Sequence, residues 1–249
     1  MLNNNTSMKL HEMKLHVMSQ AFLEQLKDSS FSALSFEERF GLLVDNEWAA
    51  RKNNRLKSII KSAGYFFADA CLENVEYHAD RKLDKAQILR LGSCNYVQEG
   101  HNIIILGATG SGKTYLSNAF GIAANRNFYT SKYIRTPDLL GELAIARGNG
   151  SYQKAVKLYK QVKLLILDDW LLFQPQGNEA RDLLDIVEAR YKKASTIFCS
   201  QFVVGGWFSR IAETTLADAI CDRIVHDSYT IDIGGVDSMR KRKGLINEA

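Results

Sequence analysis

The sequence predicts an α/β protein built around a five-stranded parallel sheet. From residue 66 onward, short apolar runs rich in branched residues alternate with helical patterns, as in a parallel sheet covered by helices on both faces. The composition, 46% hydrophobic and 24% charged, is that of a globular chain. The longest apolar runs are far too short to cross a bilayer, so we expect no membrane-spanning segment.

Residues 1–65 differ from the rest and predict a small helical module. Apolar residues recur at helical spacing over residues 8–27. A further helix is expected after Ser35, because Ser35 and Glu38 stand three apart as a capping box, and it should run to Lys61 before Gly64. This module is small for a core of its own, so we expect it to pack on a neighbour and to serve assembly, DNA binding or partner binding.

Residues 66–249 are expected to form the main domain. Strands are predicted at 102–106, 128–134, 164–168, 196–200 and 229–233. Helical patterns between them occupy 113–125, 137–147 and 178–193. The polar start of the chain shows no signal-peptide apolar region, so we expect a cytoplasmic protein. The four cysteines, which have no C-x-x-C spacing, are expected to be free thiols: Cys71, Cys94, Cys199 and Cys221.

The strongest motif is "GATGSGKT", which fits G-x-x-x-x-G-K-[ST] without a mismatch and stands between a predicted strand and a predicted helix. Its glycines let the backbone wrap a phosphate chain, and the amides of residues 109–114 face the anion with the helix N-terminus. The pattern assigns Lys113 to the β- and γ-phosphates of ATP and the Thr114 hydroxyl to Mg²⁺. The candidate nucleotide-binding residues are Gly107, Ala108, Thr109, Gly110, Ser111, Gly112, Lys113, Thr114 and Tyr115.

Two adjacent carboxylates, Asp168 and Asp169, end the predicted strand 164–168. A P-loop protein needs a carboxylate at the end of another parallel strand near the magnesium ion, so Asp168 is the candidate metal ligand, directly or through water. Asp169 is the candidate to orient or deprotonate the attacking water. A glutamate at this position would reach about 1 Å further than the aspartate does. A catalytic carboxylate misplaced by that distance costs about 10²-fold in rate. We therefore expect slow hydrolysis, or hydrolysis that depends on a subunit contact which closes the site.

A further polar group is expected near the γ-phosphate, at the end of the neighbouring strand. The predicted strand 196–200 leads into Ser200 and Gln201, and either side chain can hydrogen-bond a phosphate oxygen or the water. Gln201 is preferred because its amide both donates and accepts and reaches further.

Several segments together resemble the IstB helper ATPases of insertion sequences, AAA+ relatives of the helicase loader DnaC. The resemblance covers nearly the whole chain, in the family's order, and rests on "LSFEERFGLLVDNEW", "GATGSGKTYL", "RTPDLLGEL", "LLILDDW", "DLLDIVEARY", "STIFCSQF", "LADAICDRIVHDSYTIDI" and "SMRKRKG". The first and last segments discriminate, because any P-loop ATPase has the middle motifs. The resemblance implies an AAA+ ATPase domain over residues 66–249, with ATP and Mg²⁺ as cofactors.

The resemblance also implies roles for three arginines. Arg223 stands where such proteins carry an arginine finger, which would reach the nucleotide of the adjacent subunit. Arg190 matches a family arginine near the subunit boundary, although Ala189 replaces the acid expected beside it. Arg240 would contact phosphate or DNA. Residues 234–249 are too few for the helical lid of most AAA+ motors, so we expect no C-terminal lid domain and favour ATP as an assembly switch.

The formal net charge of +4 permits an anionic partner. The resemblance implies non-specific binding of double-stranded DNA through its backbone, on the inner surface of an oligomer and with strong salt dependence. The sequence carries no motif for reading bases. Candidate DNA contacts are Lys132, Arg135, Arg147, Lys154, Lys157, Arg240, Lys241, Arg242 and Lys243.

The combined expectation is an ATP-dependent, DNA-binding helper of transposition. It would assemble head-to-tail on target DNA with ATP, recruit and stimulate a transposase subunit, and hydrolyse ATP in a DNA-stimulated reaction. The main alternative is a helicase loader that grips a hexameric helicase with its N-terminal module. A stand-alone small-molecule kinase is disfavoured, because the sequence signals neither an acceptor pocket nor a lid.

Overall fold

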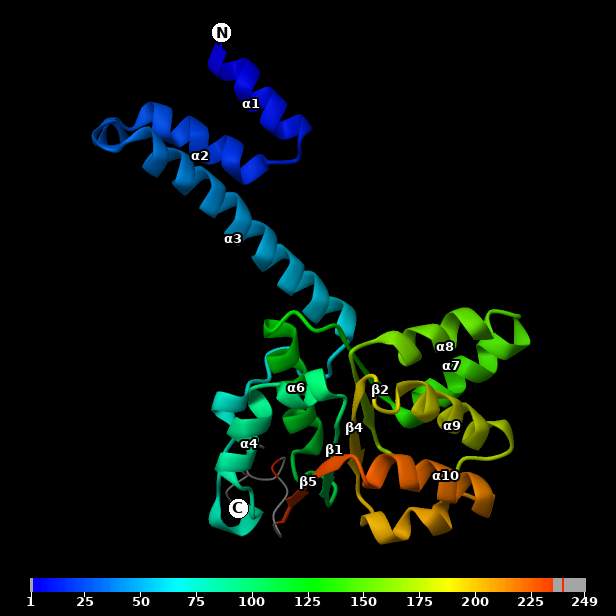
Figure 1. Cartoon of the computed structure of the whole chain (residues 1–249). Coiled ribbons are helices and arrows are strands. Elements are labelled where there is room, and N and C mark those ends of the chain that lie inside the picture. Colours follow the sequence, from blue (N-terminus) through cyan, green and yellow to red (C-terminus); the bar gives the residue numbers. More distant parts are fainter. Residues whose placement is uncertain (1, 235–238, 240–249) are drawn as a thin grey trace, which may run out of the picture. The chain divides into compact units, whose positions relative to one another are not determined.

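A sheet of five parallel strands forms the centre of the larger part of the chain (Figure 1). In the computed structural model, which describes residues 2–234 and 239, the strands are β1 (Asn102–Gly107), β2 (Ser131–Arg135), β3 (Leu164–Asp168), β4 (Ser195–Ser200) and β5 (Ser228–Ile233). Their order across the sheet is β2-β3-β4-β1-β5. The predicted fold class and the five predicted strands are confirmed.

Helices cover both faces of this sheet, because side chains of successive strand residues point to opposite faces. Ile103 and Ile105 of β1 pack in one core with three helices: α4 (Lys85–Gly92), α5 (Asn95–Glu99) and α6 (Lys113–Arg126). Ile104 and Leu106 pack in a second core with four: α7 (Thr136–Gly148), α8 (Tyr152–Gln161), α9 (Asn178–Arg190) and α10 (Thr214–Val225). The arrangement leaves the carboxyl ends of the strands for the loops that carry the predicted site.

The strand register sets which residues meet at that edge. Arg135, the last residue of β2, lies opposite Asp168, the last residue of β3. On the other side, Ser200 at the end of β4 lies opposite Leu106 of β1. The acid-bearing end of β3 is therefore flanked by the end of β2, while the start of the phosphate-binding motif lies beside the end of β4.

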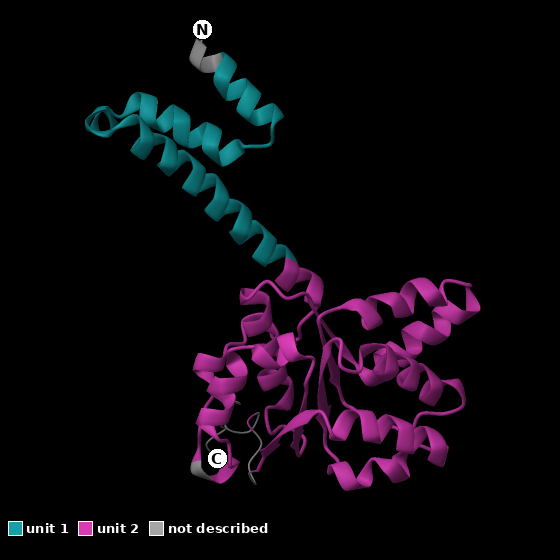
Figure 2. Cartoon of the chain, viewed as in Figure 1, with its two compact units in different colours: residues 1–58 teal, residues 59–249 magenta. Residues whose placement is uncertain are grey.

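The described chain divides into two compact units, residues 1–58 and 59–249 (Figure 2). The smaller unit contains α1 (Leu2–Glu12), α2 (His16–Lys27) and most of α3 (Phe36–Ala63), which ends before Gly64 at φ 72°. The capping box is confirmed: the Ser35 amide donates to Glu38 Oε2 at 2.8 Å, and the Glu38 amide donates to Ser35 Oγ at 3.2 Å. The assignment of residues 1–65 as a separate functional domain stays a prediction.

Some element boundaries differ from those predicted. The helical pattern at 8–27 is broken between α1 and α2, where Lys14 adopts φ 60°. Strand β2 begins three residues later than expected, because Phe128 has φ 62° and belongs to the turn after α6. Helix α9 ends at Arg190, before Lys192 at φ 54°. In each case a residue other than glycine adopts the left-handed region in a turn, which the sequence pattern did not signal.

Short 3₁₀ turns complete the described structure: η1 (Ser29–Ala33), η2 (Leu72–Asn74), η3 (Ala79–Arg81), η4 (Val204–Gly206) and η5 (Phe208–Arg210). Helices α4, α5, α8 and α10 were not among the predicted elements. No helix within residues 2–234 is both long enough and apolar enough to pass through a membrane.

Candidate nucleotide site

The "GATGSGKT" motif forms the loop between β1 and α6, as its sequence context predicts. All three of its glycines adopt positive φ, the region that favours glycine, and Gly110 has φ 80°. Gly107 has φ 154°, and an added Cβ there would lie 2.7 Å from Ser111 Oγ and 2.9 Å from the Ile233 carbonyl oxygen. Gly112, the N-cap of α6, has φ 97°. Ser111 Oγ is buried and has no hydrogen-bond partner among the described residues, so the loop offers a donor that a phosphate oxygen would satisfy.

Lys113 keeps its ammonium group against this loop. The side chain is only 7% exposed, and Nζ donates to the carbonyl oxygens of Gly107 at 2.7 Å and Ala108 at 2.8 Å. A buried cation is thereby held at the N-terminus of α6, whose exposed amides also favour negative charge. The position suits the predicted contact of Lys113 with phosphate.

Asp168 and Thr114, the predicted magnesium ligands, lie in direct contact. Thr114 Oγ1 donates to Asp168 Oδ2 at 2.7 Å, and the hydroxyl of Tyr133 donates to the same oxygen at 2.9 Å. Burial, followed by the charge of Asp168, raises the pKa of Tyr133, which keeps the phenol protonated as a donor. The donor set of one hydroxyl and one carboxylate fits Mg²⁺, which takes few protein ligands and completes its shell with phosphate and water.

Asp169 begins a tight turn after β3, with φ 53°. Its Oδ2 accepts a hydrogen bond of 2.8 Å from Nε of Arg135, at the end of β2. This hydrogen bond raises the pKa of Arg135 above its ordinary value. Arg135 was predicted as a DNA contact, and the structure places it beside the candidate catalytic carboxylate instead of on a remote surface.

The turn that carries Asp169 is fixed from the side of β4. The Trp170 amide donates to the Cys199 carbonyl at 2.8 Å, and the Ser200 hydroxyl donates to the Trp170 carbonyl at 3.0 Å. Arg210 Nε donates to the Leu171 carbonyl at 2.6 Å. Trp170 itself is fully buried, which is consistent with the tight turn being anchored in the core. Arg210 was missed from the sequence, because nothing local marks it as a partner of a turn 39 residues away.

The choice between Ser200 and Gln201 is informed by their contacts. Ser200 is fully buried and its hydroxyl serves the Trp170 turn. Gln201 faces the phosphate-binding loop, where its Oε1 accepts from Thr109 Oγ1 at 2.9 Å. Gln201 therefore lies beside the phosphate-binding loop, and its contact with the γ-phosphate stays a prediction.

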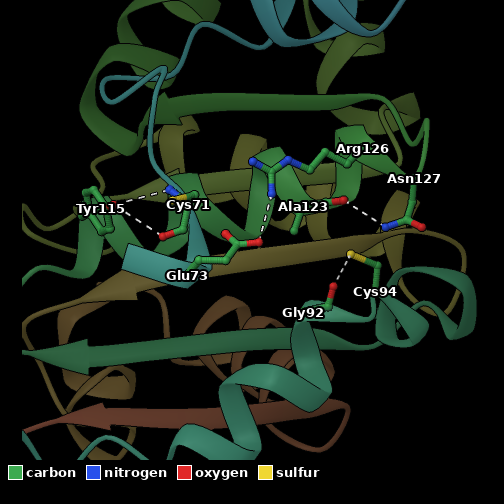
Figure 3. Close-up of polar contacts among 8 residues, drawn as sticks. All are labelled: Cys71, Glu73, Gly92, Cys94, Tyr115, Ala123, Arg126 and Asn127. Carbon is green, nitrogen blue, oxygen red and sulfur yellow. Dashed lines mark hydrogen bonds and ion pairs between the residues drawn. The ribbon is translucent and has the colours of Figure 1, made fainter. Parts of the chain in front are cut away.

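The Tyr115 side chain contacts the segment before α4, and its predicted role in nucleotide binding stays a prediction. Figure 3 shows its hydroxyl directed at the main chain of Cys71, at 3.4 Å from both the amide nitrogen and the carbonyl oxygen.

The same view shows Cys94 Sγ donating to the Gly92 carbonyl at 3.4 Å. All four cysteines are free thiols, as predicted.

Arg190 differs from its expected place near a subunit boundary. It is 2% exposed, and its guanidinium donates to the Thr196 hydroxyl and to the carbonyl oxygens of Tyr159, Val162 and Ser195. These bonds join α9 to β4 and to the end of α8. The guanidinium is thus committed to the fold of its own subunit, which a local motif cannot show, and its place near a subunit boundary stays a prediction.

Arg223 lies on α10 in an ion pair with Glu188 of α9, at 2.8 Å. Its NH1 also donates to the Ala219 carbonyl at 2.8 Å. The side chain is 30% exposed, so it is partly accessible from outside this subunit. The structure does not bring Arg223 together with the loop residues of its own chain through any contact among the described residues.

The candidate DNA contacts are dispersed over the larger unit. Arg147 pairs with Asp182 at 2.5 Å and stacks over the Tyr152 ring, while Lys154 is exposed on α8. Lys132 is half-buried on β2, and Lys157 is exposed on α8. The basic residues Arg240, Lys241, Arg242 and Lys243 lie outside the described residues.

A phosphate-binding loop between β1 and α6, with an acid at the end of β3, defines a P-loop nucleotide-binding protein. Solved structures with a similar fold include DnaI, with a TM-score of 0.58 and 24% identity over 71% of this chain and 93% of that chain. DnaA from Aquifex aeolicus bound to AMPPCP has a TM-score of 0.56 and 21% identity over 69% of this chain and 52% of that one. These likenesses show that the fold is shared with DnaI and DnaA.

The chain belongs to the family of IstB-like ATP binding proteins, whose model matches residues 8–246. It is 38% identical over 244 residues to the insertion sequence ATP-binding protein y4pL of Sinorhizobium fredii, covering 98% of each chain. The ATP-binding protein of insertion sequence IS1162 from Pseudomonas fluorescens is 39% identical over 201 residues, 81% of this chain and 87% of the relative. The resemblance inferred from the motifs is confirmed: the chain is an IstB-like ATP-binding protein, similar to ATP-binding proteins of insertion sequences.

Proposed function

We propose that this protein is an ATP-dependent, DNA-binding helper of transposition. With ATP it assembles head-to-tail on double-stranded target DNA and recruits and stimulates a transposase. The observation that carries the proposal is the convergence of Lys113, Thr114 and Asp168 at one edge of the sheet, in a chain related over nearly its whole length to insertion-sequence ATP-binding proteins.

We assign each role to the group whose position supports it. Lys113 and the amides of the 107–114 loop bind the phosphates of ATP. Thr114 and Asp168 would hold Mg²⁺, which would supply positive charge to offset that of the phosphates. Asp169 orients the attacking water and accepts its proton, and Gln201 hydrogen-bonds a γ-phosphate oxygen or that water. Tyr133, which donates to Asp168, keeps that carboxylate aimed at Thr114.

Arg223 is the proposed arginine finger, acting on the nucleotide of an adjacent subunit. To do so it must leave Glu188. Partly exposed ion pairs of this kind contribute only about 0–1 kcal/mol, so the release costs little compared with what a finger supplies to the transition state. This arrangement would make hydrolysis depend on assembly.

DNA is proposed to bind through its phosphate backbone. Lys154 and Lys157 on α8 are exposed cations that can bind DNA phosphates. Arg135 can also bind a DNA phosphate, and it donates a hydrogen bond to Asp169. Because the contacts are electrostatic, binding should weaken steeply as salt rises.

Electron microscopy of the full chain with duplex DNA and a non-hydrolysable ATP analogue tests the proposal. We expect ordered oligomers that require both DNA and nucleotide, and none with Lys113→Ala, which cannot hold the phosphates. Unchanged assembly by Lys113→Ala would overturn the ATP switch. Co-purification then identifies the partner: a transposase supports the helper, whereas capture of a replicative helicase would move the assignment to a helicase loader.

A further inference from the structure

Arg81 places a second buried cation against the phosphate-binding loop. It ends the η3 turn, 32 residues before Lys113 in the chain (113 − 81), and is 6% exposed. Its NH2 donates to the Ser111 carbonyl at 2.9 Å, and its NH1 donates to the Glu76 carbonyl at 2.7 Å. An added Cβ on Gly112 would lie 3.0 Å from the same NH2. The guanidinium therefore contacts the loop at Ser111 and Gly112 and ties it to the Glu76 carbonyl.

The bond to Ser111 fixes the direction of a loop amide. In a trans peptide the C=O and the following N–H lie in one plane and point in opposite directions. Since the Ser111 carbonyl points at Arg81, the Gly112 N–H points away from Arg81. An anion cradle needs its amides directed inward and its carbonyls outward, because a carbonyl facing the phosphate would repel it.

The turn that presents Arg81 is itself held in place. The Arg81 amide donates to the His78 carbonyl at 3.0 Å, and Lys82 follows with φ 53°. Gly234, just after β5, approaches Lys82 so closely that an added Cβ would lie 2.9 Å from Lys82 Cδ. Arg81 thus acts from a rigid support between the end of the sheet and the loop.

The electrostatic setting points the same way. Arg81 and Lys113 both bring positive charge to the N-terminal end of α6, where the helix dipole disfavours cations. Such an arrangement favours a multiply charged anion at the loop. A polyphosphate fits this charge better than a neutral ligand does.

We propose that Arg81 is a positioning residue of the nucleotide site, which orients the Gly112 amide toward the β-phosphate region shared by ATP and ADP. The inference rests on the nucleotide site of the proposed function. It predicts that loss of Arg81 weakens the binding of ATP and the binding of ADP by the same factor, because both nucleotides carry the phosphates that the loop amides bind. Loss of a residue that held the γ-phosphate itself would weaken the binding of ATP far more than that of ADP.

Calorimetric titration of the full chain with ATP and with ADP, each with Mg²⁺, tests this. Arg81→Met keeps an apolar stem but removes the donors, and we expect both dissociation constants to rise about tenfold, the effect of about 1.4 kcal/mol. Arg81→Lys should recover part of the loss, because an ammonium can still donate to one carbonyl. Arg126→Ala is the matched control, because Arg126 forms an exposed ion pair with Glu73 (Figure 3). This variant should bind both nucleotides as the wild type does.

The possible outcomes separate this inference from the proposed function. If the wild type binds both nucleotides and Arg81→Met binds them equally well, the role of Arg81 is overturned and the ATP site stands. A loss confined to ATP, or no recovery with Arg81→Lys, also overturns it. If the wild type binds neither nucleotide, the proposed function fails with it. The thermal midpoint of each variant without nucleotide shows whether the protein is folded, and Arg81→Lys provides the comparison if Arg81→Met is not.

Discussion

The guanidinium of Arg135 donates a hydrogen bond of 2.8 Å to the carboxylate of Asp169, joining the end of β2 to the turn after β3. The bond occupies an oxygen that the proposed reaction needs as a proton acceptor. Arg135 is also 48% exposed, so a DNA phosphate can compete with Asp169 for it. A single side chain thereby connects a candidate DNA contact to a candidate catalytic group.

Arg135→Ala should therefore raise ATP hydrolysis in the absence of DNA and remove most of the stimulation by DNA. The expected rise is up to about tenfold, the factor given by about 1.4 kcal/mol. Phosphate release measured with and without duplex DNA shows the effect. Lys154→Ala is the control, because Lys154 is an exposed candidate contact on α8 and should leave the DNA-free rate unchanged. A DNA-free rate that falls in Arg135→Ala would mean that the arginine assists Asp169.

Asp169→Asn should slow hydrolysis by about 10²-fold or more while leaving ATP affinity unchanged, because an amide cannot accept the proton of the attacking water. The substitution preserves size and keeps an oxygen that can accept from Arg135. Single-turnover hydrolysis and equilibrium nucleotide binding separate the two effects. Full activity in this variant would leave Asp169 as a solvated acid beside the metal.

Arg223→Ala should bind ATP normally but lose hydrolysis by about 10³-fold, as expected for a missing arginine finger. Glu188→Gln is the matched control, because it removes the ion-pair partner of Arg223 and leaves the guanidinium in place. That control should retain hydrolysis. Mixing the Arg223→Ala and Lys113→Ala proteins tests whether the finger acts between subunits. Restored turnover in the mixture means that one subunit supplies Arg223 to the nucleotide of another. Normal turnover by Arg223→Ala alone would contradict the finger.

Arg190→Met should lower the free energy of unfolding by roughly 3 kcal/mol or more, since it leaves several buried carbonyl oxygens without their donor. Burial lowers the pKa of Arg190 to about 9, so the guanidinium is still protonated at neutral pH. Urea unfolding monitored by circular dichroism measures the loss. Arg181→Ala, an exposed position on the same helix, should change stability by no more than about 0.5 kcal/mol. Equal midpoints for the two variants would show that the Arg190 bonds contribute little.

Glu47 caps a helix other than its own. Its Oε2 accepts from the amides of Val17 and Met18 in the first turn of α2, at 3.0 Å each, and Oε1 accepts from Arg51 at 2.7 Å. The hydrogen bond from Arg51, with those from the two amides, lowers the pKa of Glu47 below its ordinary 4.5. The stabilisation is therefore present above pH 4.5 and is lost as the pH falls through the lowered pKa.

Glu47→Gln should consequently destabilise the protein by about 1 kcal/mol at pH 7, the usual value of a helix cap. The difference from the wild type should vanish in acid, where both side chains are neutral, and thermal unfolding at the two pH values measures it. Glu24→Gln, an exposed change on α2, should show no such difference at either pH. A gap between Glu47→Gln and the wild type that persists at low pH would contradict the capping role.

The parts of the site carried by local pattern could be predicted from the sequence. The phosphate-binding loop is a continuous motif, and β3 is an apolar run that ends in its two acids, so both could be located without the fold. Helix α8 could not, because its apolar spacing from Tyr152 through Val156 to Tyr159 spans only two turns. The order of the strands across the sheet could not be predicted from the sequence either, so the position of β2 next to β3 could not be predicted.

Residues whose role depends on distant partners were missed or misplaced for the same reason. Arg135 was predicted from its charge alone, which cannot show that Asp169 lies within reach. Arg81 attracted no notice, because η3 carries no motif and reaches Ser111 only through the tertiary fold. Arg190 stands in a segment typical of the family, yet its burial depends on carbonyls from α8 and β4.

Strand β2 lies at one border of the sheet, and side chains of this strand contact both acids. Tyr133 donates to Asp168 and Arg135 donates to Asp169, so two residues of one short strand contact the two carboxylates. On the proposed roles of these acids, a molecule that binds this border strand would act on the metal ligand and on the water-activating group at once, without a change transmitted through the hydrophobic core.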